Sequence, residues 1–592
     1  MTSFSFSPKA RQAAKRVPDV PFLVTDQQAT NKYLILDTLT LCKRSKTDKY
    51  GSQDHSDQNK HDKEQDGSRL HISAHQSTLA LALASMKLPI AQTHLRGLAI
   101  LLLAHTSFAQ SFPGSLGQNT TCNEQCHQLV QLGTEFEADS FAHTPLDDFY
   151  TPPNTFNTSM EPGTLLRIEA HTDLTNYTVP SGLTMSRIMY TSQSLNGTIV
   201  PVSAFVLWPY APFQSTAEYG GHGRGHQPQS GVSKFPMVAW AHGTAGYFVN
   251  CAPSNYRSLQ YNFMTSYSLA LEGFAVVATD YAGLGVTTRS DGESSHEWLA
   301  GPAGANDVAY AIEAARKAFP DQLDKEGPFV TMGHSQGGNV AWAFAERQVS
   351  SPVPGYRGTI AISPVTRLLD LVDKALAVAA STLPASWPLW VPIVIGLQPP
   401  IIASITTSFS GYNFSGMTPL SYDRWNNVLK PAQGCLAAGG LAFADVTLDQ
   451  LARPGWTNNS IAQHWQQEVA AGGKKFMGPL LVLAGEDDAL PIDFLEEGVA
   501  SSCNAGGDQS AEMFTYQAMK HFPVIQASRM KWMGWIKERI AGGDNHWMGK
   551  EPGTCGQNTF VEGLNTNYTL QPITANWLVD WVAPAEAWKL SF

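Results

Sequence analysis

The sequence predicts an α/β protein with a mostly parallel central sheet, and three observations lead to this prediction. Short apolar runs alternate with amphipathic helical stretches from about residue 184 onward. The runs are continuously apolar, as expected for strands that are covered on both faces of a parallel sheet. The 592 residues are 43% hydrophobic and only 15% charged, which fits a globular protein with a substantial core.

The expected elements follow one another in a regular order. Two strands flank the turn Asn196-Gly197 within residues 185–208. One helix covers residues 306–319, with Asn306 as its N-cap and Pro320 beyond its end, and another covers 338–348. Further strands are expected at residues 236–241, 274–279, 329–332, 359–363, 480–484 and 513–516.

The N-terminal part of the chain has a different composition. Residues 1–85 are strongly polar and predict a disordered extension. Residues 86–109 combine basic residues, the apolar run 98–104 and a small-x-small site that ends at Ala109, a pattern typical of a secretory signal peptide. We therefore expect translation to start at Met86 and the mature chain to begin at Gln110. A genuine extension before an apolar core segment is the alternative.

Two further features favour a secreted, extracellular glycoprotein. The cysteines beyond residue 109 form an even set of six without the spacing of a paired zinc site, so disulfides are expected. These cysteines are Cys122, Cys126, Cys251, Cys435, Cys503 and Cys555. Seven glycosylation sequons also follow residue 109, at Asn119, Asn157, Asn176, Asn196, Asn413, Asn458 and Asn567.

Composition and missing motifs exclude several classes of function. The net charge of -11 argues against nucleic-acid binding, which needs a basic patch. Neither a zinc-protease HExxH motif nor a Walker-type GxxxxGK[ST] motif occurs, so neither a metal nor another cofactor is expected. The oligomeric state is not predicted.

One uncharged segment interrupts the alternation of strands and helices. Residues 375–422 contain no Asp, Glu, Lys or Arg, but Pro384, Pro388, Pro392, Pro399 and Pro400 divide the segment into pieces too short to span a membrane as a helix. We expect an inserted cap at 366–475 that is mobile, lines an acyl pocket with apolar side chains and meets lipid surfaces. A static buried helix pair is the alternative.

The remaining predicted divisions are a loop-rich segment at 110–180, the first core part at 181–365, and the second core part with a C-terminal flap at 476–592.

The segment Gly333-His-Ser335-Gln-Gly337 matches the nucleophile motif G-x-S-x-G. The match alone is weak, but it follows an expected strand and opens an expected helix, as a nucleophile elbow requires. The sharp turn exposes the serine hydroxyl and directs the positive end of the helix toward a developing oxyanion. Ser335 is therefore the predicted nucleophile.

A serine nucleophile needs a histidine base, which in this arrangement follows it in the chain. His521 comes after the expected strand 513–516 and is the predicted base. His546 lies in a glycine-rich loop and is the reserve. His464 lies in a polar helical stretch and is expected to be an ordinary surface residue.

The acid and the oxyanion donors are predicted from neighbouring strand ends. Asp487 directly follows the strand 480–484 and is the first choice for the acid, with Asp488 as its competitor. The backbone N–H of Gln336 is the first oxyanion donor. The loop 242–246 is expected to supply the second, from Thr244 or Gly246.

Together these motifs resemble the fungal secretory lipase family over about residues 140–590. The resemblance implies an α/β-hydrolase fold with an inserted helical cap, activity on acyl esters without a cofactor, and a triad of Ser335, Asp487 and His521. It also implies the disulfides Cys251–Cys435 and Cys503–Cys555, which leaves Cys122 with Cys126. The extension before Met86 and the Gly/His-rich insertion near His222 depart from the family pattern. The motifs that carry the resemblance are His242-Gly-Thr, Cys251-Ala-Pro-Ser254, Asp280-Tyr-Ala-Gly-Leu-Gly285, Gly333-His-Ser-Gln-Gly-Gly338 and Asp487 with Pro491.

The expected function is that of a secreted serine carboxylic ester hydrolase acting on hydrophobic small-molecule or lipid esters. Three alternatives stay open, because substrate does not follow from fold. They are a serine peptidase or amidase with the same triad, an esterase that deacylates a natural product, and a catalytically inactive binding protein.

Overall fold

The computed structural model describes residues 121–214, 234–287, 296–388, 390–506, 509–542 and 555–563. The chain divides into two units, Met1–Met86 and Lys87–Phe592, and every described residue belongs to the second. Several predictions therefore lie outside the described residues. They are the extension 1–85, the signal peptide 86–109, the start at Gln110, the sequons at Asn119 and Asn567, the insertion near His222 and the reserve base His546.

A ten-stranded sheet forms the centre of the described chain, in the order β1-β2-β3-β5-β4-β6-β7-β8-β9-β10. Strands β1, β2, β3 and β5 pair antiparallel, whereas all pairs from β5 to β10 are parallel. The predicted mostly parallel sheet is confirmed. The strands are β1 (Leu165–Glu169), β2 (Thr184–Gln193), β3 (Ile199–Trp208), β4 (Met237–Ala241), β5 (Ala275–Thr279), β6 (Phe329–His334), β7 (Tyr356–Ile362), β8 (Leu480–Gly485), β9 (Ala511–Tyr516) and β10 (Gln557–Val561).

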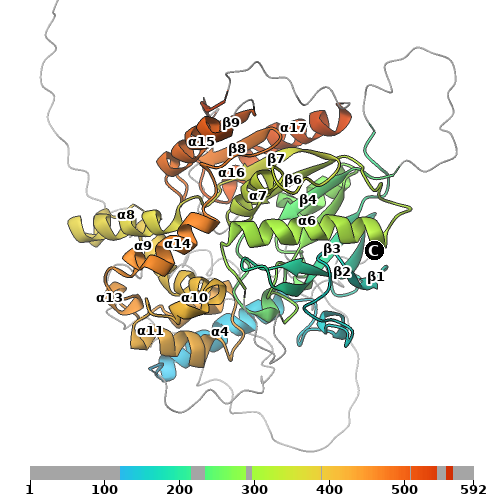
Figure 1. Ribbon diagram of the computed structural model, residues 1–592. Coiled ribbons are helices and arrows are strands. Elements are labelled where there is room, and N and C mark those ends of the chain that lie inside the picture. Colours follow the sequence, from blue (N-terminus) through green and yellow to red (C-terminus); the bar gives the residue numbers. More distant parts are fainter. Residues whose placement is uncertain are drawn as a thin grey trace, which may run out of the picture. The chain divides into compact units, whose positions relative to one another are not determined.

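Helices cover both faces of this sheet. One face packs against α6 (Gly301–Ala318), α7 (Gln336–Arg347) and α15 (Ile492–Gly506). Figure 1 shows α6 lying across the strands on this side. The other face packs against α5 (Ser266–Leu271), α16 (Pro523–Ala527) and α17 (Arg529–Ala541). This two-sided cover explains why most of the parallel strands are apolar throughout.

The predicted start of α6 was wrong. Asn306 lies inside the helix, because α6 begins at Gly301 with Pro302 in its first turn. The Asn306 side chain instead donates to the carbonyl of Gln193 and accepts from Arg347. A polar residue that joins two neighbouring elements thus resembled a cap in the sequence.

The segment expected to be loop-rich contains regular structure. Helix α4 (Glu124–Asp139) begins at the N-cap Asn123 and ends before Ser140, and β1 forms the sheet edge. Gly133 of α4 packs so tightly on α12 (Leu436–Ala442) that a Cβ there would lie 2.6 Å from the Cα of Ala438. The hydrophobic pattern of α4 is weak because two of its four buried residues, Gly133 and Glu137, are not hydrophobic.

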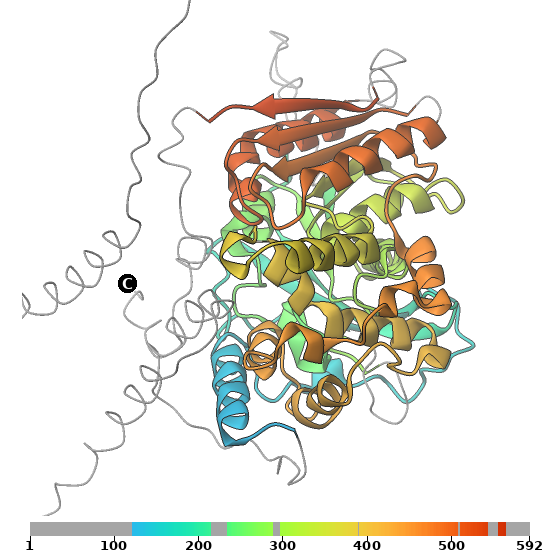
Figure 2. The ribbon, with the colours of Figure 1, turned by 90° about the vertical axis from the view of Figure 1, so that its left-hand side faces the viewer.

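Between β7 and β8, the described chain contains only helices and loops, as an inserted cap requires. Figure 1 shows α8 to α14 together beside the sheet, and Figure 2 shows the N-terminal helix α4 beside the same group. The cap helices are α8 (Leu368–Ser381), α9 (Trp390–Gly396), α10 (Gln398–Ser408), α11 (Pro419–Asp423), α12, α13 (Leu448–Leu451) and α14 (Ser460–Val469).

The apolar segment of the cap forms α9 and α10. No single helix among the described residues has the length and hydropathy of a membrane span. Helices α9 and α10 meet that test only when they are joined across a bend of 42°. Most of their side chains are buried within the cap, including Val391, Ile395, Ile401 and Ile402.

The three expected disulfides are all present: Cys122–Cys126, Cys251–Cys435 and Cys503–Cys555. The second joins the loop after β4 to the start of α12, and so ties the core to the cap. The third joins α15 to the residues just before β10.

Candidate active site

The loop between β6 and α7 forms a sharp turn around Ser335. The Ser335 backbone has φ 59° and ψ -118°, a conformation that is strained for a residue with a side chain. A Cβ at Gly333 would lie 2.0 Å from the carbonyl oxygen of Gly337, and a Cβ at Gly337 would lie 1.9 Å from that of Ala241. Ser335 keeps partial exposure although both of its neighbours are buried. The predicted elbow is therefore present, and its glycines are sterically required.

His521 lies beside this elbow. Its ring centroid is 4.6 Å from that of His334, the residue before Ser335. The loop after β9 brings it there, and β6 and β9 are parallel strands whose carboxyl ends lie at the same edge of the sheet.

Asp488, and not Asp487, contacts this histidine. The Nδ1 atom of His521 lies 2.7 Å from Oδ1 of Asp488. Asp487 is exposed, so its choice as the acid is corrected to the competitor Asp488. Neighbouring aspartates after a strand point in different directions, and the sequence did not show which one faces the interior.

Several contacts keep Asp488 ionised in its buried position. Burial raises the pKa of this carboxyl, but the nearby His521 and the hydrogen bonds from Ser363 and Leu490 outweigh that effect and hold the pKa below its usual value. The ionised carboxylate accepts from Nδ1–H of His521, which leaves Nε2 free to take a proton. Ser363 was not predicted, because its role depends on the adjacency of β7 and β8.

The predicted oxyanion loop 242–246 runs beside the elbow. A Cβ at Gly243 would lie 3.2 Å from the carbonyl oxygen of His334. The Thr244 hydroxyl accepts from Nε1 of Trp298 at 3.0 Å. Gly246 packs against the disulfide, where a Cβ would lie 2.4 Å from Sγ of Cys251. Thr244 and Gly246 both stay predictions as donors.

Gln336, the other predicted donor, has its side chain held by a buried histidine. Its Nε2 lies 3.0 Å from Nε2 of His296, whose Nδ1 lies 2.9 Å from the carbonyl oxygen of Ala282. Burial lowers the pKa of His296 to about 4, so the ring is neutral at physiological pH and its Nε2 accepts from Gln336. This pairing fixes the start of α7.

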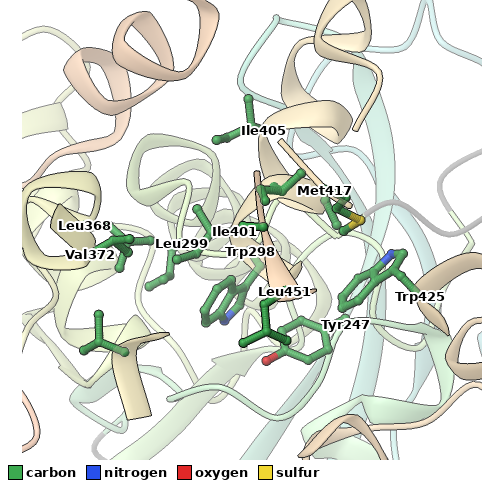
Figure 3. Close-up of a cluster of buried hydrophobic side chains, with 14 of the residues drawn as sticks. Tyr247, Trp298, Leu299, Leu368, Val372, Ile401, Ile405, Met417, Trp425 and Leu451 are labelled. Atoms are coloured by element: carbon green, nitrogen blue, oxygen red, sulfur yellow. The ribbon is translucent and has the colours of Figure 1, made fainter. Parts of the chain in front are cut away.

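A cavity of about 310 Å³ lies between the core and the cap. Two of the residues that line it are His296, the hydrogen-bond partner of Gln336, and Trp298, the hydrogen-bond partner of Thr244. Figure 3 shows Tyr247, Trp298 and Trp425 near one another in the adjoining cluster. The other residues of its wall are Phe248, Pro400, Ala403, Ser404, Thr406, Thr407, Ser410, Asn413, Phe414, Asn426 and Lys430.

The lining of this cavity is mixed, and the predicted apolar acyl pocket stays a prediction. About half of the residues around this cavity are polar, including Asn413, Asn426 and Lys430. The large aliphatic residues of the cap, such as Ile402 and Ile405, are fully buried and pack against one another. The movement of the cap stays a prediction.

The other predicted residues lie away from this site. His464 is exposed on α14, as expected of a surface residue. The described residues contain no group of three or more His, Cys, Asp or Glu side chains able to hold a metal ion. The five described sequon asparagines are all exposed, and these are Asn157, Asn176, Asn196, Asn413 and Asn458.

The sheet order, the elbow and the acid–histidine pair define the α/β-hydrolase fold. Residues 238–530 match the alpha/beta hydrolase family, which agrees with this fold. Two crystal structures of Candida antarctica lipase A have a similar fold. The closed state is 15% identical with a TM-score of 0.52, covering 70% of this chain and 89% of the lipase. The second is 15% identical with a TM-score of 0.51, covering 73% and 94%. No curated protein matches the sequence.

Proposed function

We propose that this protein is a serine carboxylic ester hydrolase that works through an acyl-enzyme. The observation that carries the proposal is the strained Ser335 elbow beside a histidine that is paired with the buried Asp488. A positioned histidine and an ionised acid are what a serine hydroxyl needs to become a nucleophile.

The proposed reaction has two halves. His521 Nε2 takes the hydroxyl proton of Ser335 while Oγ bonds to the ester carbonyl carbon, and the carbonyl oxygen becomes an oxyanion. The N–H of Gln336 and one from the loop 242–246 stabilise that charge. The C–O bond to the alcohol breaks, and His521 protonates the leaving alcohol. Water, deprotonated by His521, then attacks the acyl carbon, and the acid leaves as Ser335 regains its proton.

The substrate proposed is an ester with a hydrophobic acid or alcohol part. The aromatic side of the 310 Å³ cavity supports an apolar group, and the polar side supports hydrogen bonding to the rest of the substrate. The similar fold of a lipase and the motifs shared with the fungal secretory lipase family favour an ester over an amide. We further propose that the protein is secreted, which the three disulfides and the exposed sequons support.

The test is a panel of p-nitrophenyl esters of rising acyl length, run beside aminoacyl-nitroanilides with wild type and Ser335→Ala. We expect ester hydrolysis by wild type only, with little cleavage of the anilides. Faster cleavage of the anilides would indicate a peptidase or amidase. An absence of hydrolysis of either class by folded wild-type protein would contradict the proposal.

A further inference from the structure

A chain of hydrogen bonds joins two loops of the candidate site through the last residue of β6. The hydroxyl of Tyr261 lies 2.7 Å from Nδ1 of His334, and Nε2 of His334 lies 2.9 Å from the carbonyl oxygen of His521. The N–H of Gly243 hydrogen bonds to the same tyrosine hydroxyl. The chain thus connects the oxyanion loop, the residue before Ser335 and the backbone of the base.

The direction of each hydrogen bond follows from chemistry. A carbonyl oxygen only accepts, so Nε2 of His334 carries a proton and donates to His521. Burial lowers the pKa of His334 to about 3, and the ring is therefore neutral with Nδ1 as an acceptor. Tyr261 consequently donates to Nδ1. The tyrosine stays protonated because burial raises its pKa.

The surrounding structure holds Tyr261 rigidly. Leu259, Gln260 and Asn262 all have positive φ, at 50°, 63° and 38°, so the backbone on both sides of Tyr261 is strained. A Cβ at Gly243 would lie 2.1 Å from the tyrosine oxygen, which leaves room only for glycine at that position. Strain that is maintained at one buried hydroxyl indicates that its position matters.

We propose that Tyr261 and His334 are positioning residues that set the place of His521 relative to Ser335 and the oxyanion loop. The inference rests on the proposed function, since it assigns His521 as the base. Neither residue touches substrate. His334 fixes the backbone of the base directly, and Tyr261 fixes the tautomer and orientation of His334. A small displacement of a catalytic group lowers the rate of the chemical step more than it lowers binding.

The first test compares Tyr261→Phe with Tyr190→Phe. Tyr190 is a matched control, because its buried hydroxyl also makes two hydrogen bonds, to Thr279 and to the carbonyl of Asp307, within the sheet and α6. We expect both variants to lose similar thermal stability. Only Tyr261→Phe should lower kcat, by roughly 10- to 100-fold, with KM nearly unchanged. Equal kcat in the two variants would overturn the role of Tyr261.

The second test separates the two hydrogen bonds of His334. In His334→Gln, the amide nitrogen reaches the place of Nε2 and keeps a donor for the carbonyl of His521. In His334→Asn, the shorter amide keeps an acceptor for Tyr261 but loses that donor. We expect His334→Gln to retain more kcat than His334→Asn when the folded fraction is determined by circular dichroism.

Equal kcat in the two His334 variants, or a higher value in His334→Asn, would contradict the role of His334. Wild-type activity distinguishes the two levels of the proposal. If wild type hydrolyses esters and the variants behave like their controls, only the positioning inference fails. If folded wild type hydrolyses no ester, the proposed function itself fails.

Discussion

Asp488 and His521 form the central contact of the candidate site, with Oδ1 of the aspartate 2.7 Å from Nδ1 of the histidine. The aspartate side chain is fully buried, whereas the histidine keeps 16% exposure. A buried acid with a partly exposed base is the arrangement that lets the histidine exchange protons with a substrate while its tautomer stays fixed.

Replacing Asp488 by Asn is expected to lower kcat by about 10⁴-fold, because an amide no longer selects the productive tautomer of His521. Asp487→Asn is the control, since Asp487 is adjacent but exposed, and it should stay close to wild type. Steady-state kinetics on one soluble ester measures both. A larger loss of kcat in Asp487→Asn than in Asp488→Asn would show that Asp487 is the acid and that the assignment of Asp488 is wrong.

The glycines of the elbow should be intolerant of any side chain. Gly337→Ala would place a methyl group 1.9 Å from the carbonyl oxygen of Ala241, so we expect loss of folded protein or of activity. Gly534→Ala is the control, because it lies inside α17 and a Cβ there meets no heavy atom within 4 Å. The control should gain about 0.5–1 kcal/mol of unfolding free energy. Urea denaturation tests both, and a stable, active Gly337→Ala would contradict the elbow geometry.

Buried carboxyl groups predict greater stability at mildly acidic pH. Burial raises the pKa of Glu137, Asp307 and Glu346 to about 7 and that of Asp280 to about 6. The folded state therefore holds more protons than the unfolded state, and stability falls as pH rises from about 4.5 to 7. The lowered pKa values of the buried His242, His296 and His334 act in the opposite direction up to about pH 6.5, but these three groups are fewer than the four carboxyls. The lowered pKa of Asp488 also acts in the opposite direction, below this window.

The melting temperature should consequently be higher at pH 5 than at pH 8. Glu346→Gln should reduce the corresponding difference in unfolding free energy by an amount on the order of 3 kcal/mol, because the amide has no charge to desolvate. Glu468→Gln is the matched control, since Glu468 is exposed on α14. A melting temperature that rises from pH 5 to pH 8 would show that these carboxyls do not dominate the pH dependence of stability.

The tip between α8 and α9 is expected to meet lipid surfaces. Leu383 is 76% exposed there, and Trp387 lies nearby on the same uncharged segment. Activity on a medium-chain triglyceride should rise steeply at the solubility limit, and Leu383→Asp or Trp387→Asp should reduce that rise while sparing soluble acetate esters. Met530→Asp is the control, because Met530 is 86% exposed on α17. If wild-type activity instead saturates smoothly as the triglyceride concentration passes its solubility limit, the cap has no interfacial role.

The sequence predicted the central strands and the elbow better than it predicted the acid of the site and the N-terminal helix α4. Continuous apolar strands and the elbow motif depend on local patterns, so β4 to β9 and the sharp turn at Ser335 were located correctly. The choice between Asp487 and Asp488 depends on which side chain meets Ser363, and only the packing of β7 against β8 determines that. Helix α4 escaped notice for a similar reason, because its close packing on α12 joins residues about 300 positions apart.

Covalent labelling of the nucleophile tests the central claim most directly. A fluorophosphonate probe should form one adduct, mapped by peptide mass spectrometry to Ser335, and ester hydrolysis should disappear in proportion to labelling. Folded Ser335→Ala should take up no label and should lose about 10⁶-fold in kcat. An adduct on another residue, or hydrolysis by Ser335→Ala within about tenfold of wild type, would contradict the assignment of Ser335 as the nucleophile.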